Sequence, residues 1–195
     1  MKPATAFAER HPWGVLLGAL AVWVLLWSAC QPLRAQPQTL AARSDEVKAA
    51  YLYKFLDYVE WPDAAFASPE QPLIIGVVGA DPVHAELRRI LVGRTSRGRS
   101  VVARKLVPGD AFDGVQLVFV GDAGLARSPW VQRLRDRPLL IVADTPQALD
   151  LGAAINFIVI EDRLRFEASV RAAERAGLKL SSRLLSLAQR VVPGT

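Results

Sequence analysis

The sequence predicts a single α/β domain, a sandwich in which a mostly parallel sheet of about six strands carries helices on both faces. Three runs of strand length, at 73–78, 116–120 and 139–143, are almost wholly apolar. Such runs are typical of parallel strands that are buried on both faces. Segments with helix signals separate the runs, which is the alternation expected of a helix-covered sheet. Two further runs near the C-terminus lie two residues apart, which predicts an antiparallel hairpin.

The first 35 residues have the pattern of an export signal. Lys2 and Arg10 lie in a short basic segment, an apolar run covers 13–29, and Ala35 supplies a small residue at a cleavage point. The sequence therefore predicts cleavage after Ala35 and export of the rest of the chain. An uncleaved anchor is an alternative, because the apolar run is only slightly shorter than a membrane span.

A lipoprotein signal is a second alternative for this segment. Cys30 is the only cysteine, and the residues before it loosely resemble a bacterial lipidation site, from which Trp27 departs. That departure makes lipidation of Cys30 the less favoured interpretation. We expect membrane contact only through an uncleaved or lipidated N-terminus. Once Cys30 is removed or lipidated, the domain has no thiol chemistry and no disulfide.

The composition of the exported part gives no reason to expect nucleic acid as a partner. The first 35 of the 195 residues hold three of the 24 Lys and Arg residues and one of the 19 Asp and Glu residues. Cleavage therefore lowers the net charge from +5 to +3. Such a balance requires neither a nucleic acid nor an anionic membrane. The remaining length is enough for one domain with a single core.

An amphipathic helix is predicted at the start of a domain that spans 45–192, after a polar linker at 36–44. Ser44 can cap the helix, and Pro62 ends it by excluding Trp61 from the helical conformation, so that Trp61 becomes an anchor. The apolar positions recur at steps of three and four and so share one face. They are Val47, Ala50, Tyr51, Phe55, Tyr58 and Val59. This face predicts docking on the sheet, and a partner-binding helix is the alternative.

Helix and strand signals continue in alternation along the chain. Asp81-Pro82 and Ser128-Pro129 each open a predicted helix, and a further strand is expected at 100–106. Two more helices are expected at the end of the chain, at 169–176 and 182–191. The last of these helices is expected to bury an apolar stripe that includes Val191.

The C-terminal hairpin is predicted to join strands at 154–160 and 163–168 through Glu161-Asp162, at the edge of the sheet. Charged and apolar residues alternate strictly in its second strand, so one face of that strand is charged. The charged positions are Arg163, Arg165 and Glu167. We expect this charged face to point outward.

Five short blocks of the sequence occur in a fixed order behind the export signal. They are 47–55 with Trp61-Pro62, 155–157, 163–167, 176–178 and 181–185. Together they resemble the YfiR family of bacterial periplasmic proteins. The resemblance implies a periplasmic, homodimeric repressor that binds the periplasmic sensor region of an inner-membrane diguanylate cyclase and so lowers cyclic-di-GMP synthesis and biofilm formation. Some members carry cysteine pairs, whereas this exported chain has none, so redox control does not carry over.

The sequence gives little support for catalysis, a metal or a cofactor. After the export signal, His84 is the only histidine, so neither a transition-metal site nor a Ser-His-Asp arrangement has enough ligands or partners. The glycine-bearing turns at 76–79 and 121–124 lack the spacing of a dinucleotide or phosphate loop. We therefore expect a protein that is not an enzyme and has no cofactor. An unrecognised hydrolase or transferase is the least supported alternative.

Three groups of residues are candidates for binding a partner or a ligand. The first is aromatic, Tyr51, Phe55 and Trp61; the second is the basic loop with Arg94, Arg97 and Arg99; the third is the hairpin face with Arg163, Arg165 and Glu167. The alternative for the basic loop is that it is an ordinary solvated loop without a binding role. The alternative for the hairpin face is that its charged residues are ordinary surface charges on an edge strand. The alternative function is that of a periplasmic sensor of a small ligand. The ligand would bind at the carboxyl ends of the strands.

Overall fold

The computed structural model describes residues 38–121 and 129–194. The predicted export signal, including Cys30 and Ala35, lies outside these ranges, so its cleavage, anchoring or lipidation stays a prediction. The buried apolar residues of the core all lie between Ala49 and Leu184. These residues belong to the part of the chain from Gln38 onward, which forms one compact unit.

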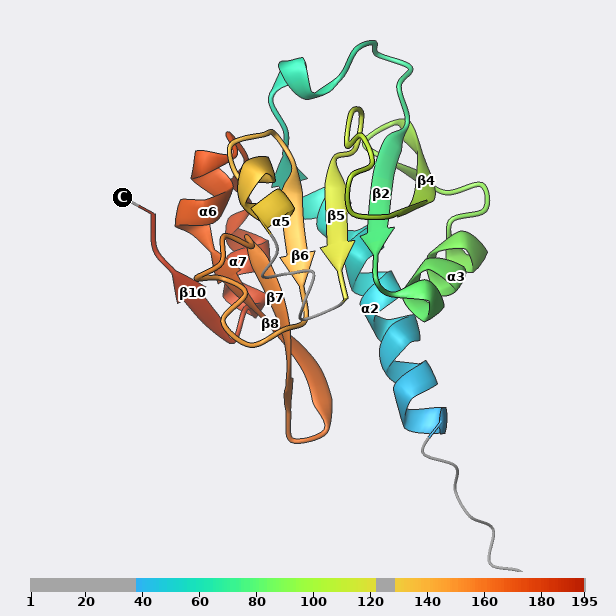
Figure 1. Cartoon of the computed structure of the whole chain (residues 1–195), viewed down its shortest axis with the longest axis vertical. Coiled ribbons are helices and arrows are strands. Elements are labelled where there is room, and N and C mark those ends of the chain that lie inside the picture. Colours follow the sequence, from blue (N-terminus) through green and yellow to red (C-terminus); the bar gives the residue numbers. More distant parts are fainter. Residues whose placement is uncertain (1–37, 122–128, 195) are drawn as a thin grey trace, which may run out of the picture. The chain divides into compact units, whose positions relative to one another are not determined.

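Eight strands form one mixed sheet, in the order β10-β8-β7-β6-β5-β2-β4-β3 (Figure 1). The five strands from β7 to β4 are mutually parallel, and β8 and β3 run antiparallel to their neighbours β7 and β4. The strands are β2 (Leu73–Val78), β3 (Thr95–Ser96), β4 (Arg99–Leu106), β5 (Leu117–Val120), β6 (Leu140–Ala143), β7 (Ile155–Ile160), β8 (Arg163–Ser169) and β10 (Arg190–Val192).

Helices cover both faces of this sheet, as predicted. One core cluster joins α2, α3, α6 and α7 to one face, and the other joins α5 to the opposite face; in Figure 1, α5 lies in front of the sheet and α2 behind it. The helices are α2 (Gln38–Tyr58), α3 (Asp81–Ile90), α5 (Pro129–Leu134), α6 (Val170–Arg175) and α7 (Ser182–Leu187), with a 3-10 turn η1 (Asp63–Ala65). A small antiparallel sheet pairs β1 (Val59–Glu60) with β9 (Lys179–Leu180).

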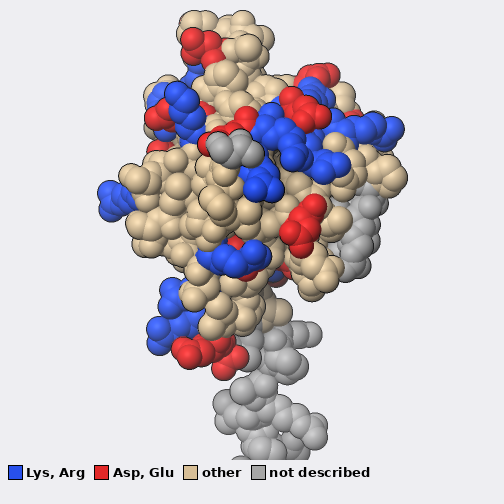
Figure 2. Space-filling model, turned by 90° about the vertical axis from the view of Figure 1, so that its left-hand side faces the viewer, with Lys and Arg blue, Asp and Glu red and all other residues tan. Residues whose placement is uncertain are grey.

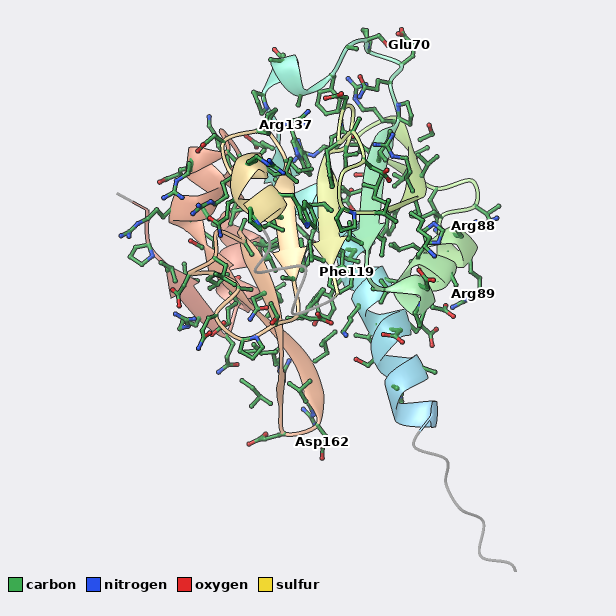
Figure 3. The ribbon with its side chains drawn as sticks, viewed as in Figure 1. Glu70, Arg88, Arg89, Phe119, Arg137 and Asp162 are labelled. Carbon is green, nitrogen blue, oxygen red and sulfur yellow. The ribbon has the colours of Figure 1, made fainter. Side chains whose placement is uncertain are left out.

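The α/β class and the C-terminal hairpin are confirmed, whereas the expected number of about six strands is too low for the main sheet. The hairpin has the predicted register, with Ile160 opposite Arg163. Its two turn residues, Glu161 and Asp162, have φ values of 50° and 56°, as a type I′ turn requires. Asp162 lies at the tip of the hairpin (Figure 3). The additional strands β3 and β10 have two and three residues, which is too short to leave a periodic signal in the sequence.

The first helix begins earlier than predicted. Since α2 starts at Gln38, most of the segment expected as a linker is helical, and Ser44 lies inside the helix instead of capping it. Residues 38–43 include Leu, Arg and two Ala residues and neither Gly nor Pro, so their helix propensity is high. The helix ends at Tyr58, because Val59 and Glu60 pair with β9.

The last helix ends earlier than predicted. α7 stops at Leu187, and Ala188 is extended with a ψ of 138°. The backbone N–H of Gln189 then donates to the carbonyl oxygen of Phe166 at 2.8 Å, which starts β10 alongside β8. Val191, expected in a buried stripe, is 39% exposed, because it belongs to the short edge strand.

Candidate functional site

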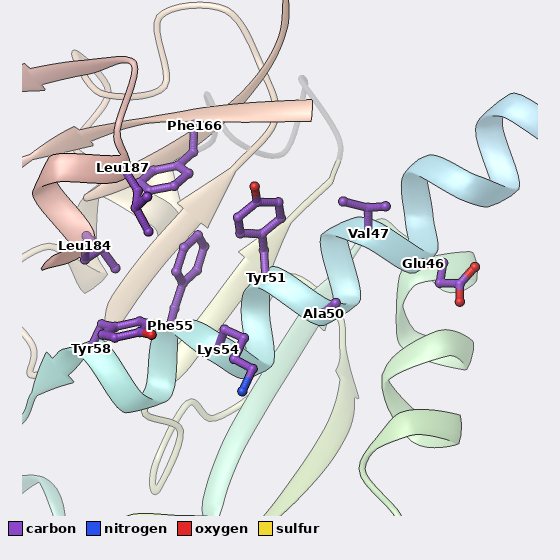
Figure 4. Close-up of a pocket in the computed structure, with 10 residues that line it drawn as sticks. All are labelled: Glu46, Val47, Ala50, Tyr51, Lys54, Phe55, Tyr58, Phe166, Leu184 and Leu187. Carbon is purple, nitrogen blue, oxygen red and sulfur yellow. The ribbon is translucent and has the colours of Figure 1, made fainter. Parts of the chain in front are cut away.

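An apolar groove lies between α2, α7 and β8. Its volume is about 450 Å³, and Figure 4 shows side chains from the three elements around it. We call it the apolar groove. It is lined by Glu46, Val47, Ala50, Tyr51, Lys54, Phe55, Tyr58, Phe166, Leu184 and Leu187. Eight of these ten residues are aliphatic or aromatic, so the groove is suited to apolar side chains.

The orientation of α2 explains why this groove exists. Ala49, Leu52 and Leu56 are fully buried toward the sheet, and Lys48 forms a 2.7 Å ion pair with Asp144 after β6. The face predicted to dock on the sheet is therefore largely turned toward the groove, and only Phe55 and Val59 of that set are buried in the core. The prediction failed because α2 is apolar on two adjacent faces, so periodicity alone could not select the inner one.

The floor of the groove is an aromatic cluster. Phe55 is 3% exposed, and its ring centroid lies 5.3 Å from that of Phe166 and 5.8 Å from that of Tyr51. Such tilted contacts fix the rings in place. Tyr51 is half-buried above this floor. Of the two binding candidates that line the groove, Tyr51 is therefore accessible to a partner, whereas Phe55 is mainly structural.

Leu187 is the most exposed large apolar residue among the lining residues that sequence reasoning missed. It is 62% exposed and ends α7 at the side of the groove opposite α2 (Figure 4). A leucine near the end of a predicted helix gives no signal of exposure, because the helix was expected to continue to residue 191. Exposed large apolar side chains beside a groove are a common mark of an interaction surface.

Trp61 lies away from the apolar groove. Its indole N–H donates to the carbonyl oxygen of Gln116 at 3.0 Å, and its half-buried ring packs against the main core cluster. Trp61 thus joins the chain after α2 to the start of β5. The structure does not bring Trp61 together with Tyr51 and Phe55.

The three arginines of the basic loop are not gathered at one site. Arg97 donates to the carbonyl oxygens of Leu56 and Asp57 at the end of α2, at 3.2 and 3.4 Å. Arg99 donates to the carbonyl oxygens of Ser68 and Gln71, at 2.9 and 2.8 Å. Arg94 is exposed and has no side-chain hydrogen bond to the described residues. Two of the three guanidinium groups therefore hold the loop in place, which no sequence pattern could have indicated.

The arginines of the hairpin face are exposed. β7 and β8 extend beyond the other strands (Figure 1), and both Arg163 and Arg165 are exposed on β8. Glu167 differs from them, because its side chain is 16% exposed and forms a 2.7 Å ion pair with Arg190 of β10. Asn156, Glu167 and Arg190 are register partners on adjacent strands. Glu167 therefore helps to hold β10 on the sheet.

The Glu167 pair predicts a pH dependence of stability. The hydrogen bond from Arg190 holds the pKa of the Glu167 carboxyl below its usual value, against the opposing effect of burial. The folded state therefore favours the ionised carboxylate, and the pair stabilises the fold above about pH 4.3, the usual pKa of glutamate. This stabilisation is lost as the pH falls through the lower pKa of the folded state. In thermal melts at neutral pH, we expect Glu167→Gln to have a lower Tm than the wild type. This difference in Tm should shrink as the pH is lowered.

Glu161→Gln is the matched control for that experiment. Glu161 lies in the exposed hairpin turn and makes no ion pair with the described residues. We expect its difference in Tm from the wild type to stay small at every pH. A deficit of Glu167→Gln that is constant from neutral to acidic pH would contradict the assignment of the ion pair.

The described ranges contain no cluster of three or more His, Cys, Asp or Glu side chains that could hold a metal ion. No helix in the same ranges is long and apolar enough to cross a membrane.

The described part of the chain is thus an α/β sandwich with an apolar groove, from a family that is regulatory and periplasmic and is not a known class of enzymes. The chain is a member of the YfiR/HmsC-like family, whose model matches residues 45–189. This family is known in the regulation of cyclic-di-GMP signalling. No curated protein matches the chain in a sequence search.

Proposed function

We propose that this protein is a periplasmic repressor that contacts the periplasmic sensor region of an inner-membrane diguanylate cyclase and so lowers cyclic-di-GMP synthesis and biofilm formation. The proposal rests on family membership and on one structural observation, the apolar groove. We also propose that the protein is exported through its N-terminal signal and acts as a homodimer. It acts by binding and not by catalysis.

The groove supports this proposal through the kind of contact that it offers. Tyr51 and Tyr58 are half-buried and Leu187 is exposed beside the aromatic floor. Tyrosine is common among the residues that dominate the energy of protein interfaces, and apolar anchors in a groove exclude water around them. An apolar side chain from the sensor region would fill the groove. Glu46 and Lys54 would then face polar groups at its margin.

A small-ligand sensor is the second candidate, and the size of the groove favours it. Its volume of about 450 Å³ falls within the range of small-molecule sites, roughly 300–1,000 Å³. An apolar ligand in the groove would compete with the cyclase and release it, provided that the ligand binds the free protein better than the complex.

We expect Leu187→Glu to weaken binding of the cyclase by at least about tenfold, which corresponds to roughly 1.4 kcal/mol. A carboxylate at this position would have to be desolvated against the aromatic floor when the partner binds. The experiment is capture from solubilised inner membranes by the immobilised domain, residues 36–195, with quantification of a diguanylate cyclase by mass spectrometry. The affinity for the purified sensor region of that cyclase is then measured.

Val92→Glu is the matched control. Val92 is also an exposed aliphatic residue, at 81%, but it follows α3 and is not part of the groove lining. The same charge is therefore added outside the proposed interface, and binding should stay within about twofold of the wild type. Equal losses in both variants, or capture of no diguanylate cyclase by the wild type, would count against the proposal.

A further inference from the structure

A second cavity, with a polar character, lies where α5, α6 and the turn at 149–152 meet. Its volume is about 270 Å³. We call it the arginine cavity, because Arg135, Arg171 and Arg175 all line it. None of its lining residues is part of the apolar groove. Figure 2 looks onto the side of the molecule formed by α6 and β10, where many basic side chains gather with acidic ones between them.

The three arginines carry more positive charge than the cavity neutralises. Asp150 is the single acidic residue of the lining, and none of the three guanidinium groups forms an ion pair with the described residues. By contrast, Arg89, Arg137 and Arg190 each pair with a carboxylate elsewhere on the surface. Arg171 and Arg175 are also four residues apart on α6, a spacing at which like charges repel each other. An anion between them would remove this repulsion.

Arg135 is held in position by its surroundings. Its Nε donates to the carbonyl oxygen of Gln132 at 3.3 Å, and its aliphatic stem lies against Gly152. A Cβ atom at Gly152 would come within 2.1 Å of Cδ of Arg135, so a side chain there would displace the stem. Gly152 also has a φ of 103°, which favours glycine. The half-buried guanidinium is therefore fixed beside the cavity and does not move freely in solvent.

We infer that the arginine cavity binds a small ligand through a phosphate group. Guanidinium groups bind phosphate oxygens with two parallel hydrogen bonds, which a lysine cannot do. Three of them from two separate segments, Arg135 directly after α5 and the other two on α6, line this cavity and supply the donors that a tetrahedral anion needs. The phosphate group belongs either to a soluble phosphate compound or to a phospholipid head group. This site is independent of the apolar groove and of the proposed cyclase partner.

The test uses two probes on the domain of residues 36–195. Calorimetric titration with inorganic phosphate represents the soluble source, and co-flotation with phosphatidylglycerol vesicles represents the lipid source. We expect saturable binding of at least one probe and a loss of about tenfold or more in affinity when Arg171→Gln and Arg175→Gln are combined. Whichever probe binds identifies the source of the phosphate group.

The control variant combines Arg163→Gln and Arg165→Gln. It removes the same charge from two exposed arginines on the hairpin, away from the cavity lining, and should change the affinity by less than about twofold. Equal melting temperatures of the two double variants show that folding is preserved. The inference is overturned if the wild type binds neither probe, or if both double variants lose affinity equally, since a general charge effect would then explain the binding.

Discussion

Phe55→Ala is expected to lower the free energy of unfolding by about 3–5 kcal/mol. Phe55 is 3% exposed and its ring contacts the rings of Tyr51, Phe157 and Phe166. The variant loses the transfer free energy of a buried aromatic ring, its tilted and stacked contacts, and the packing around the resulting cavity. Urea unfolding followed by circular dichroism measures this difference.

Leu187→Ala provides the comparison for Phe55→Ala. Leu187 lines the same groove but is 62% exposed, so its truncation should change stability by less than about 0.5 kcal/mol. A small effect of Phe55→Ala, similar to that of Leu187→Ala, would mean that Phe55 is not part of the core and that the groove floor is misassigned.

Gln116→Leu is expected to cost about 2–4 kcal/mol, although the new side chain is apolar and similar in size. The Gln116 side chain is 1% exposed. Its Oε1 accepts from the backbone N–H of Ile74 at 2.9 Å, and its Nε2 donates to the carbonyl oxygen of Ala65 at 3.1 Å. Leucine leaves both backbone groups without these partners, and each buried group left unpaired costs about 1–3 kcal/mol. Equilibrium unfolding measures the loss.

Gln189→Leu is the control for this substitution. Gln189 is exposed, and its described hydrogen bond to Phe166 comes from the backbone N–H, which leucine retains. Its stability should therefore stay within about 0.5 kcal/mol of the wild type. A stable Gln116→Leu variant would show that the two side-chain hydrogen bonds contribute little.

The parallel strands and the hairpin could be predicted because their signals are local. Residues 73–78 and 139–143 are apolar along their whole length, and Glu161-Asp162 separates two alternating runs. The edge strands β3 and β10 could not be predicted, since two or three residues carry no periodicity. The pairing of β10 depends on groups that are distant in sequence, such as the ion pair between Glu167 and Arg190. The end of α7 at Leu187 follows from the same pairing.

The candidate site was predicted only in part, for a related reason. Tyr51 was selected because it belongs to an aromatic helix face, and it does line the apolar groove. The same pattern also selected Phe55, which is buried, because helical spacing does not distinguish a core position from an accessible one. Arg97 and Arg99 bind backbone carbonyls of distant segments. Such contacts depend on the tertiary fold, so the sequence showed only a basic loop.

We propose that this protein restrains a diguanylate cyclase through the apolar groove. The most direct test measures cyclic-di-GMP in cells that lack the gene and in the same cells complemented with wild type, Leu187→Glu or Val92→Glu at equal protein levels. We expect the deletion to raise cyclic-di-GMP, wild type and Val92→Glu to restore the lower level, and Leu187→Glu to fail. An unchanged level after deletion, or full restoration by Leu187→Glu, would contradict the claim.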